Sequence, residues 1–282
     1  MRRGLVIALA LSSISACALI ASLPDYEERA SDGGTLVDGD PEIDGTTTDG
    51  GSDGSIGVDA KPDVAALGCG PPVGNGLVAY YRLDEGTGTS AADCTGSSPG
   101  TFGGEPPRWV TGRIGPFALG FDGGGFVDVS GNAALGIAGA ISVVAWVKIT
   151  SFSSAGRIIA KGGGPADRGW NLNVENDGKA LLQLGLEPSG QIAVSTATAV
   201  PTGRWIHLAG TFDPGKALRI HVDGAEQGAV TTGVPANMRV SPTPANLGRR
   251  GDGCCGLVGE IDDVRVFTRA LSPSEIAALA AQ

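Results

Sequence analysis

The densest group of reactive side chains is a run near the end of the chain, Glu260-Ile261-Asp262-Asp263-Val264-Arg265. Two carboxyl groups about 5 Å apart could act as the nucleophile and the acid of a retaining glycosidase. Arg265 closes the run, and a guanidinium neither gives nor accepts a proton at ordinary pH. The run therefore predicts no catalytic residues, and the sequence has no Gly-x-Ser-x-Gly elbow, P-loop or histidine-based metal motif elsewhere.

Tryptophans are the next candidates for chemistry, because an exposed aromatic ring can stack on a sugar face. Trp146 and Trp205 lie within apolar runs and are expected in the core. Trp109 follows two prolines, and Trp170 follows a glycine-rich segment. These two are the candidate ligand contacts, and a purely structural role for both stays open.

Five cysteines are present, and Cys17 stands apart near the N-terminus. The remaining four, Cys69, Cys94, Cys254 and Cys255, are an even number, which in an exported protein predicts two disulfides with three possible connectivities. A zinc site is disfavoured because no Cys-x-x-Cys pair occurs and both histidines fall inside strand-like runs.

The first 17 residues predict export. Arg2 and Arg3 precede an apolar run, and small residues lead directly to Cys17. This order resembles the bacterial lipoprotein signal, in which the cysteine receives the lipid. The resemblance implies a lipid anchor at Cys17, with the outer membrane as the expected destination and exposure on the cell surface as an option.

Residues 18–68 are expected to form an acidic, disordered tether. The part from position 25 onward carries twelve acidic side chains against Arg29 and Lys61 and few large apolar residues. The formal net charge of the whole chain is −10, so the low isoelectric point reflects the tether. The nearly neutral remainder, 69–282, argues against nucleic acid as a partner.

Short strands alternate with turns through residues 69–282, which predicts an all-β, two-sheet antiparallel sandwich. Asp177-Gly178 and Asp223-Gly224 are typical of hairpin turns, because they tolerate a positive φ. Near the C-terminus, Ser272, Pro273 and Glu275 predict the capping box of a short helix. The eleven expected strands are 77–83, 117–121, 126–129, 141–149, 157–161, 170–174, 180–186, 192–196, 205–212, 218–222 and 258–267.

Five segments in order resemble laminin-G-like domains of the concanavalin A-like lectin/glucanase superfamily: 76–86, 118–123, 141–147, 203–224 and 256–276. The resemblance implies a jelly-roll sandwich whose first and last strands pair, with Asp84 beside Gly259. That pairing in turn would favour a disulfide from Cys94 to Cys254 or Cys255, with Cys69 taking the other.

The same resemblance bears on metal and catalysis. Family members often hold one structural calcium, and carboxylates suit that ion. Asp84, Asp122, Asp262 and Asp263 are therefore candidate ligands, with ordinary ion pairs and turns as the alternative. The run from Glu260 nearly matches the E-x-D-x-x-E strand of jelly-roll glycoside hydrolases, but Arg265 stands in place of the last carboxylate.

The sequence thus predicts an anchored, non-catalytic binding module for carbohydrate or protein, acting in adhesion or recognition. A glycoside hydrolase on the same fold and a structural envelope lipoprotein are the alternatives.

Overall fold

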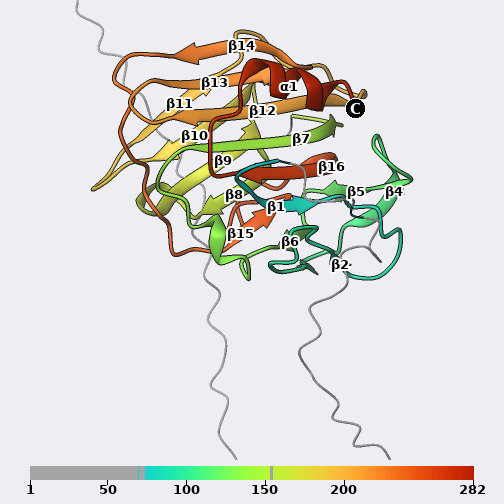
Figure 1. Ribbon diagram of the computed structural model, residues 1–282. Helices are drawn as coiled ribbons and strands as arrows, with labels where there is room; N and C mark the ends of the chain where they lie inside the picture. The colour runs from blue at the N-terminus through green and yellow to red at the C-terminus, as the bar shows by residue number, and fades with distance from the viewer. Residues whose placement is uncertain (1–68, 70–73, 153–154) are drawn as a thin grey trace, which may run out of the picture. The chain divides into compact units, whose positions relative to one another are not determined.

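The computed structural model describes Cys69 and residues 74–152 and 155–282. Within these residues the strands form two antiparallel sheets of eight, which confirms the expected sandwich (Figure 1). The first, called sheet A, has the strand order β14 (Ala225–Val230), β13 (Ala217–Val222), β12 (Ile206–Asp213), β7 (Ile141–Ile149), β16 (Val258–Phe267), β5 (Phe117–Asp122) and β4 (Arg108–Thr111). Its eighth strand, β1 (Leu77–Tyr81), pairs with β16.

Sheet B faces it, in the order β11 (Gln191–Ser195), β10 (Ala180–Gly185), β9 (Arg168–Val174), β8 (Gly156–Gly162), β15 (Ala245–Leu247), β6 (Phe126–Asp128), β3 (Gly100–Gly103) and β2 (Ser90–Ala91). Both Asp-Gly hairpin turns form as expected: Asp223 and Gly224 have φ values of 49° and 81° between β13 and β14.

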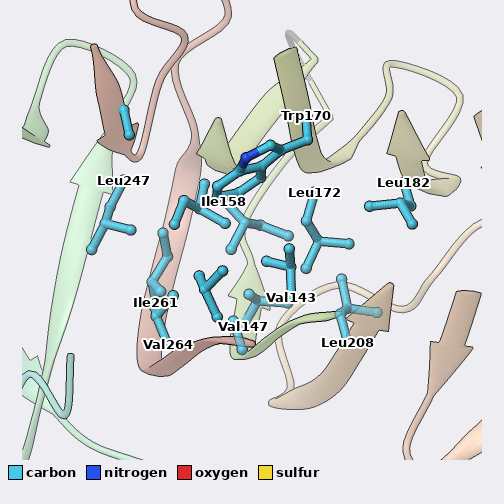
Figure 2. Close-up of a cluster of buried hydrophobic side chains, with 14 of the residues drawn as sticks. Val143, Val147, Ile158, Trp170, Leu172, Leu182, Leu208, Leu247, Ile261 and Val264 are labelled. Atoms are coloured by element: carbon cyan, nitrogen blue, oxygen red, sulfur yellow. The ribbon is translucent and has the colours of Figure 1, made fainter. Parts of the chain in front are cut away.

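The core lies between the two sheets. Alternate apolar residues of each strand point inward, as the period of two requires. Figure 2 shows Val143, Val147, Leu208, Ile261 and Val264 from sheet A against Ile158, Trp170, Leu172, Leu182 and Leu247 from sheet B. The outer face of sheet B carries mainly polar side chains, whereas Val144 and Ala209 form an apolar patch on the outer face of sheet A.

The last strand, β16, lies in the middle of sheet A. One edge pairs with β7 from Gly259 to Phe267, with an irregularity between Asp262 and Arg265. The other edge is divided, with β5 beside Val258–Ile261 and β1 beside Val264–Phe267. The first and last strands therefore pair as expected, but the expected position was wrong: β1 ends opposite Val264, because β5 already occupies the segment around Gly259.

A single α-helix is present in the described part of the chain, α1 (Pro273–Ala280), and its capping box forms as predicted. The Ser272 hydroxyl accepts the amide of Glu275, and the Glu275 carboxylate accepts the amide of Ser272 at 2.8 Å. The helix packs on the outer face of sheet A through Ile276, against Val144 and Ala209. No helix among the described residues is long and apolar enough to cross a membrane.

Candidate functional site

The carboxylates of the reactive run serve the fold. Asp262 is 0% exposed, and its Oδ2 accepts the backbone amides of Arg113 at 2.7 Å and Ile114 at 2.8 Å. Burial raises the pKa of Asp262 to about 7, because the charged form loses its hydration. The side chain of Arg113 lies over Trp146, with its guanidinium 4.3 Å from the centre of the ring.

Asp263 forms an ion pair within the same strand. Its Oδ1 lies 2.7 Å from Arg265 Nε, and its Oδ2 accepts the Tyr80 hydroxyl at 3.1 Å. Arg265 also donates to the Gln282 side chain at 2.8 Å. Arg265 therefore links Asp263 and β1 to the C-terminus, and the Asp263 carboxylate is fully engaged by these partners.

The other candidate calcium ligands have local partners as well. Asp84 accepts from Arg82 at 2.7 Å and from the amide of Phe117 at 3.3 Å, while Asp122 accepts the amide of Gly124 at 3.2 Å. Over the described ranges, no three or more His, Cys, Asp or Glu side chains form a group that could hold a metal ion. The four aspartates are thus not brought together as one ligand set.

The two candidate tryptophans lie in different environments. Trp170 is 1% exposed and donates its indole N–H to the carbonyl of Leu135 at 3.1 Å. Its predicted role as a ligand contact was wrong, because Trp170 alternates with the core residues of β9 and points into the sandwich. Trp109 is half-buried on β4 and packs against Phe102, with ring centres 5.6 Å apart.

All four cysteines of residues 69–282 form disulfides, as Cys69–Cys94 and Cys254–Cys255. The pairing implied by the family resemblance was wrong. Cys94 donates its amide to Tyr80 at the end of β1, and that end lies beside Val264 rather than the start of β16. Cys17 lies outside the described residues.

The outer face of sheet B carries polar groups that the sequence analysis missed. Register places one row straight across it, from Gln183 through Asn171 and Ala160 to Asn246 and Asp128. A second row beside it holds Ser195, Leu181, Asn173 and Arg157. We call these side chains together the amide face. Its sequence signal was the alternation Trp170-Asn171-Leu172-Asn173-Val174, in which core and amide residues take turns.

Several polar atoms of the amide face are buried without a hydrogen-bond partner among the described residues. They are the side-chain oxygens of Asn171, Asn173 and Asn246 and the Nε of Arg157. Such atoms are costly to leave unpaired, at about 1–3 kcal/mol each. A water, an ion or a ligand could supply the missing partners of these atoms.

Charge on the amide face is nearly balanced. Arg157 Nη1 lies 3.4 Å from Glu175 Oε1, and the same oxygen accepts the Asn173 side-chain amide at 2.6 Å. Desolvation lowers the pKa of the Arg157 guanidinium, against the nearby carboxylate. Beyond Asn173 the second row opens into a pocket of about 420 Å³ lined by Glu175, Leu181 and Ser195 together with Asn176, Asp177 and Lys179.

The loop Arg249–Cys255 covers the other end of the amide face. Three backbone hydrogen bonds hold this segment to β8. The amide of Gly248 donates to Ile158, and the amide of Gly251 donates to Gly162 at the other end of the strand. At the end of the loop, the Cys255 carbonyl accepts the amide of Arg157. The core occupies the inner side, so the loop lies over the outer side of β8 and β15. Asn246 beneath it is buried.

The arrangement places amide oxygens and guanidinium N–H donors together on the outer side of sheet B, where Asn171, Asn173, Asn246 and Arg157 are buried. Asp262 Oδ2 and both oxygens of Asp263 are bound as described above, whereas Asp262 Oδ1 is buried without a hydrogen-bond partner among the described residues.

A family model, Laminin_G_3 of the concanavalin A-like lectin/glucanases superfamily, matches residues 121–277. No curated protein sequence matches the chain. Among solved structures, domain 4 of AbnA is similar, with 25% identity and a TM-score of 0.58 over 72% of this chain and 98% of that one. AbnA is a GH43 extracellular arabinanase from Geobacillus stearothermophilus, and the domain is in complex with arabinotriose.

More distant structures share the fold. The binding domain of Paraclostridial Mosquitocidal Protein 1 has 14% identity and a TM-score of 0.56, covering 73% of this chain and 52% of that one. A Trypanosoma rangeli sialidase has 17% identity and a TM-score of 0.51, with 73% and 32% covered. The chain thus spans about half of the toxin domain and a third of the sialidase. With more than half of its length matched by the family model, the chain belongs to the concanavalin A-like lectin/glucanases superfamily.

Proposed function

We propose that this protein is a non-catalytic module that binds a glycan on the amide face of sheet B. The observation that carries the proposal is the set of buried, unpaired amide oxygens of Asn171, Asn173 and Asn246. Each needs a donor, and a glycan presents a hydroxyl on nearly every carbon of its ring. Because these oxygens are buried, the side chains that cover them must shift when the glycan binds. The unpaired Nε of Arg157 supplies a donor for the same ligand.

The size of the face fits an oligosaccharide. The row from Ser195 to Arg157 crosses four adjacent strands. Strands lie about 4.8 Å apart, so the row is about 14 Å long. The pocket beyond Asn173 extends the surface to the turn at Asp177. A chain of about three sugars lying across the strands would meet both the row and the pocket.

A relative of similar extent supports this choice of ligand class. Domain 4 of the arabinanase was solved with arabinotriose. The match covers 98% of that domain and 72% of this chain. A botulinum neurotoxin DC binding domain with 14% identity was solved with SialylT, and that likeness concerns the fold. The proposal therefore names a neutral oligosaccharide before a sialylated one.

The role is proposed to be binding without catalysis, because Asp262 is held by two backbone amides, Asp263 by Arg265 and Glu260 by Lys148. Export and a lipid anchor at Cys17 belong to the same proposal and are supported by the order of residues 1–17. An anchored binder on a tether would act in adhesion or surface recognition.

The test is calorimetric titration of the protein with arabinan fragments and with a panel of neutral and sialylated oligosaccharides. We expect Asn173→Ala to weaken binding by about tenfold, the factor that corresponds to the loss of one good hydrogen bond. Asn171→Ala, in the neighbouring row, should act in the same direction.

The matched control is Gln227→Ala, which removes an exposed amide from β14 on the other sheet and should leave binding unchanged. Circular dichroism checks that each variant keeps its fold. If Gln227→Ala weakens binding as much as Asn173→Ala does, the ligand lies elsewhere. If no glycan binds at all, a protein partner replaces the glycan in the proposal.

A further inference from the structure

The Cys254–Cys255 disulfide joins neighbours in the sequence, which sets it apart from Cys69–Cys94, whose cysteines are 25 residues apart. A disulfide stabilises a fold mainly by closing a loop of the unfolded chain, and the effect grows with loop length. A link between adjacent residues closes almost no loop. Stability therefore does not account for the Cys254–Cys255 bond.

Position makes this bond accessible to solvent. Cys254 is exposed and Cys255 is half-buried, whereas Cys69 and Cys94 are 7% and 5% exposed. Thiol–disulfide exchange requires a thiolate to reach a sulfur atom, so exposed disulfides exchange and buried ones resist. The two disulfides of this protein should differ in this respect.

The bond also lies within the loop that covers the amide face. The Cys255 carbonyl accepts the amide of Arg157 at 3.1 Å, and the Cys254 carbonyl accepts the amide of Arg250 at 3.0 Å. Arg250 in turn makes two hydrogen bonds of 2.8 Å to the Asp252 carboxylate. Both cysteine carbonyls therefore accept hydrogen bonds that hold the loop in place. The donor to Cys255 is Arg157, a residue of the amide face.

The far side of the loop is held by Arg249. Its guanidinium lies 3.4 Å from the centre of the Phe126 ring. Phe126 precedes the core residue Val127, so its ring is on the outer side of β6. The loop is thus attached over β6, β8 and β15, with Asn246 beneath it.

We propose that the Cys254–Cys255 disulfide is a thiol-exchange site that latches the loop over the amide face. A thiolate of a dithiol reductant attacks the exposed Cys254 sulfur, a mixed disulfide forms, and Cys255 leaves as the thiolate. The second thiol of the reductant then displaces Cys254 and becomes oxidised to a disulfide. Two electrons and two protons pass to the protein, which ends with two thiols.

Reduction removes the ring that fixes the turn at Cys254 and Cys255. The hydrogen bonds to Arg250 and Arg157 then lose their fixed acceptors, and the loop opens over β8 and β15. Opening exposes Asn246 and lengthens the amide face. This last consequence rests on the proposed glycan-binding function, whereas the exchange chemistry does not.

The experiment treats the full chain with increasing dithiothreitol, followed by alkylation and peptide mapping. We expect the peptide with Cys254 and Cys255 to be reduced at about tenfold lower dithiothreitol than Cys69–Cys94. After selective reduction, hydrogen exchange at the amides of Arg250 and Arg157 should quicken by about tenfold or more. The amide of Thr196, bonded to Ala180 on the opposite side of the sheet, is the internal control.

Simultaneous reduction of both disulfides, or free thiols at both Cys254 and Cys255 in untreated protein, would overturn the exchange site. Selective reduction without faster exchange at Arg250 and Arg157 would overturn the latch. The double variant Cys254→Ser/Cys255→Ser gives the open state without reductant and should bind the oligosaccharide about threefold more tightly than the parent. If neither protein binds any glycan, the proposed function fails while the mapping result still decides the exchange site.

Discussion

At the scale of single residues, position on the strand decides what a side chain does. Asp262 and Asp263 are neighbours of the same type, yet one holds a loop through two backbone amides and the other neutralises Arg265. Both carboxylates are buried and largely out of contact with solvent. Asn171 and Asn173 are two ordinary amides in the sequence, and their buried oxygens remain unpaired, as does Asp262 Oδ1.

Asp262 should make stability depend on pH. Its pKa is about 7 in the folded state and near 3.8 in the unfolded chain, mainly because burial disfavours the carboxylate, with Asp263 and Asp84 adding to the effect. The folded state therefore binds the proton more tightly, and the free energy of unfolding falls as pH rises from about 4 to about 7.

The variant Asp262→Asn keeps one oxygen for the amides of Arg113 and Ile114 and removes the charge. We expect its melting temperature, relative to the parent, to be higher at pH 8 than at pH 4 by about 3 °C or more. Calorimetry at the two pH values measures this difference. Equal shifts at both values would contradict the raised pKa.

The scale of elements shows which parts of the fold could be predicted from sequence. The apolar runs predicted the observed bounds of β7 and β16 correctly. The capping residues predicted where α1 begins. β14 was missed because its sequence, AEQGAV, is polar and small, and it forms only as the edge partner of β13. β15 is three residues long and is defined by its neighbours β6 and β8.

Sites depend on contacts between elements, and there the sequence was less informative. Trp170 was predicted to contact a ligand because it follows a glycine-rich segment. Its alternation with Leu172 and Val174 was the better signal, because it indicates a core position. The amide face had the same signal and was overlooked for want of a known motif. Disulfide pairing required the division of the β16 edge between β5 and β1, which no local pattern encodes.

At the N-terminus of α1, Ser272 should matter for stability. Its hydroxyl accepts the Glu275 amide, and loss of such a cap costs about 1 kcal/mol. We expect Ser272→Ala to destabilise the domain by about that amount, measured by urea unfolding. Ser189→Ala, at an exposed serine between β10 and β11, is the matched control and should change little; equal losses in the two variants would argue against the cap.

At the scale of the whole molecule, the two sheets have different tasks. The outer face of sheet A is covered by α1 and by the residues around Arg113, and its polar groups serve the fold. The outer face of sheet B carries the amide face and its loop. The two outer faces therefore differ, because α1 packs on sheet A while the loop Arg249–Cys255 is bonded to sheet B.

The Cys69–Cys94 disulfide should contribute to global stability. It closes a segment of 25 residues, for which loop entropy gives about 3 kcal/mol. We expect Cys69→Ser/Cys94→Ser to lose about that much in chemical unfolding. The Cys254→Ser/Cys255→Ser variant should lose far less, and a comparable loss there would mean that the second disulfide is structural too.

The central place of β16 in sheet A has a consequence for the order of events during synthesis. This strand is the last one made, yet β1, β5 and β7 all need it as a partner. Until Phe267 is available, these earlier strands can associate only with gaps in the middle of the sheet. Sheet B can pair without β16, whereas the centre of sheet A can close only after this strand has been made.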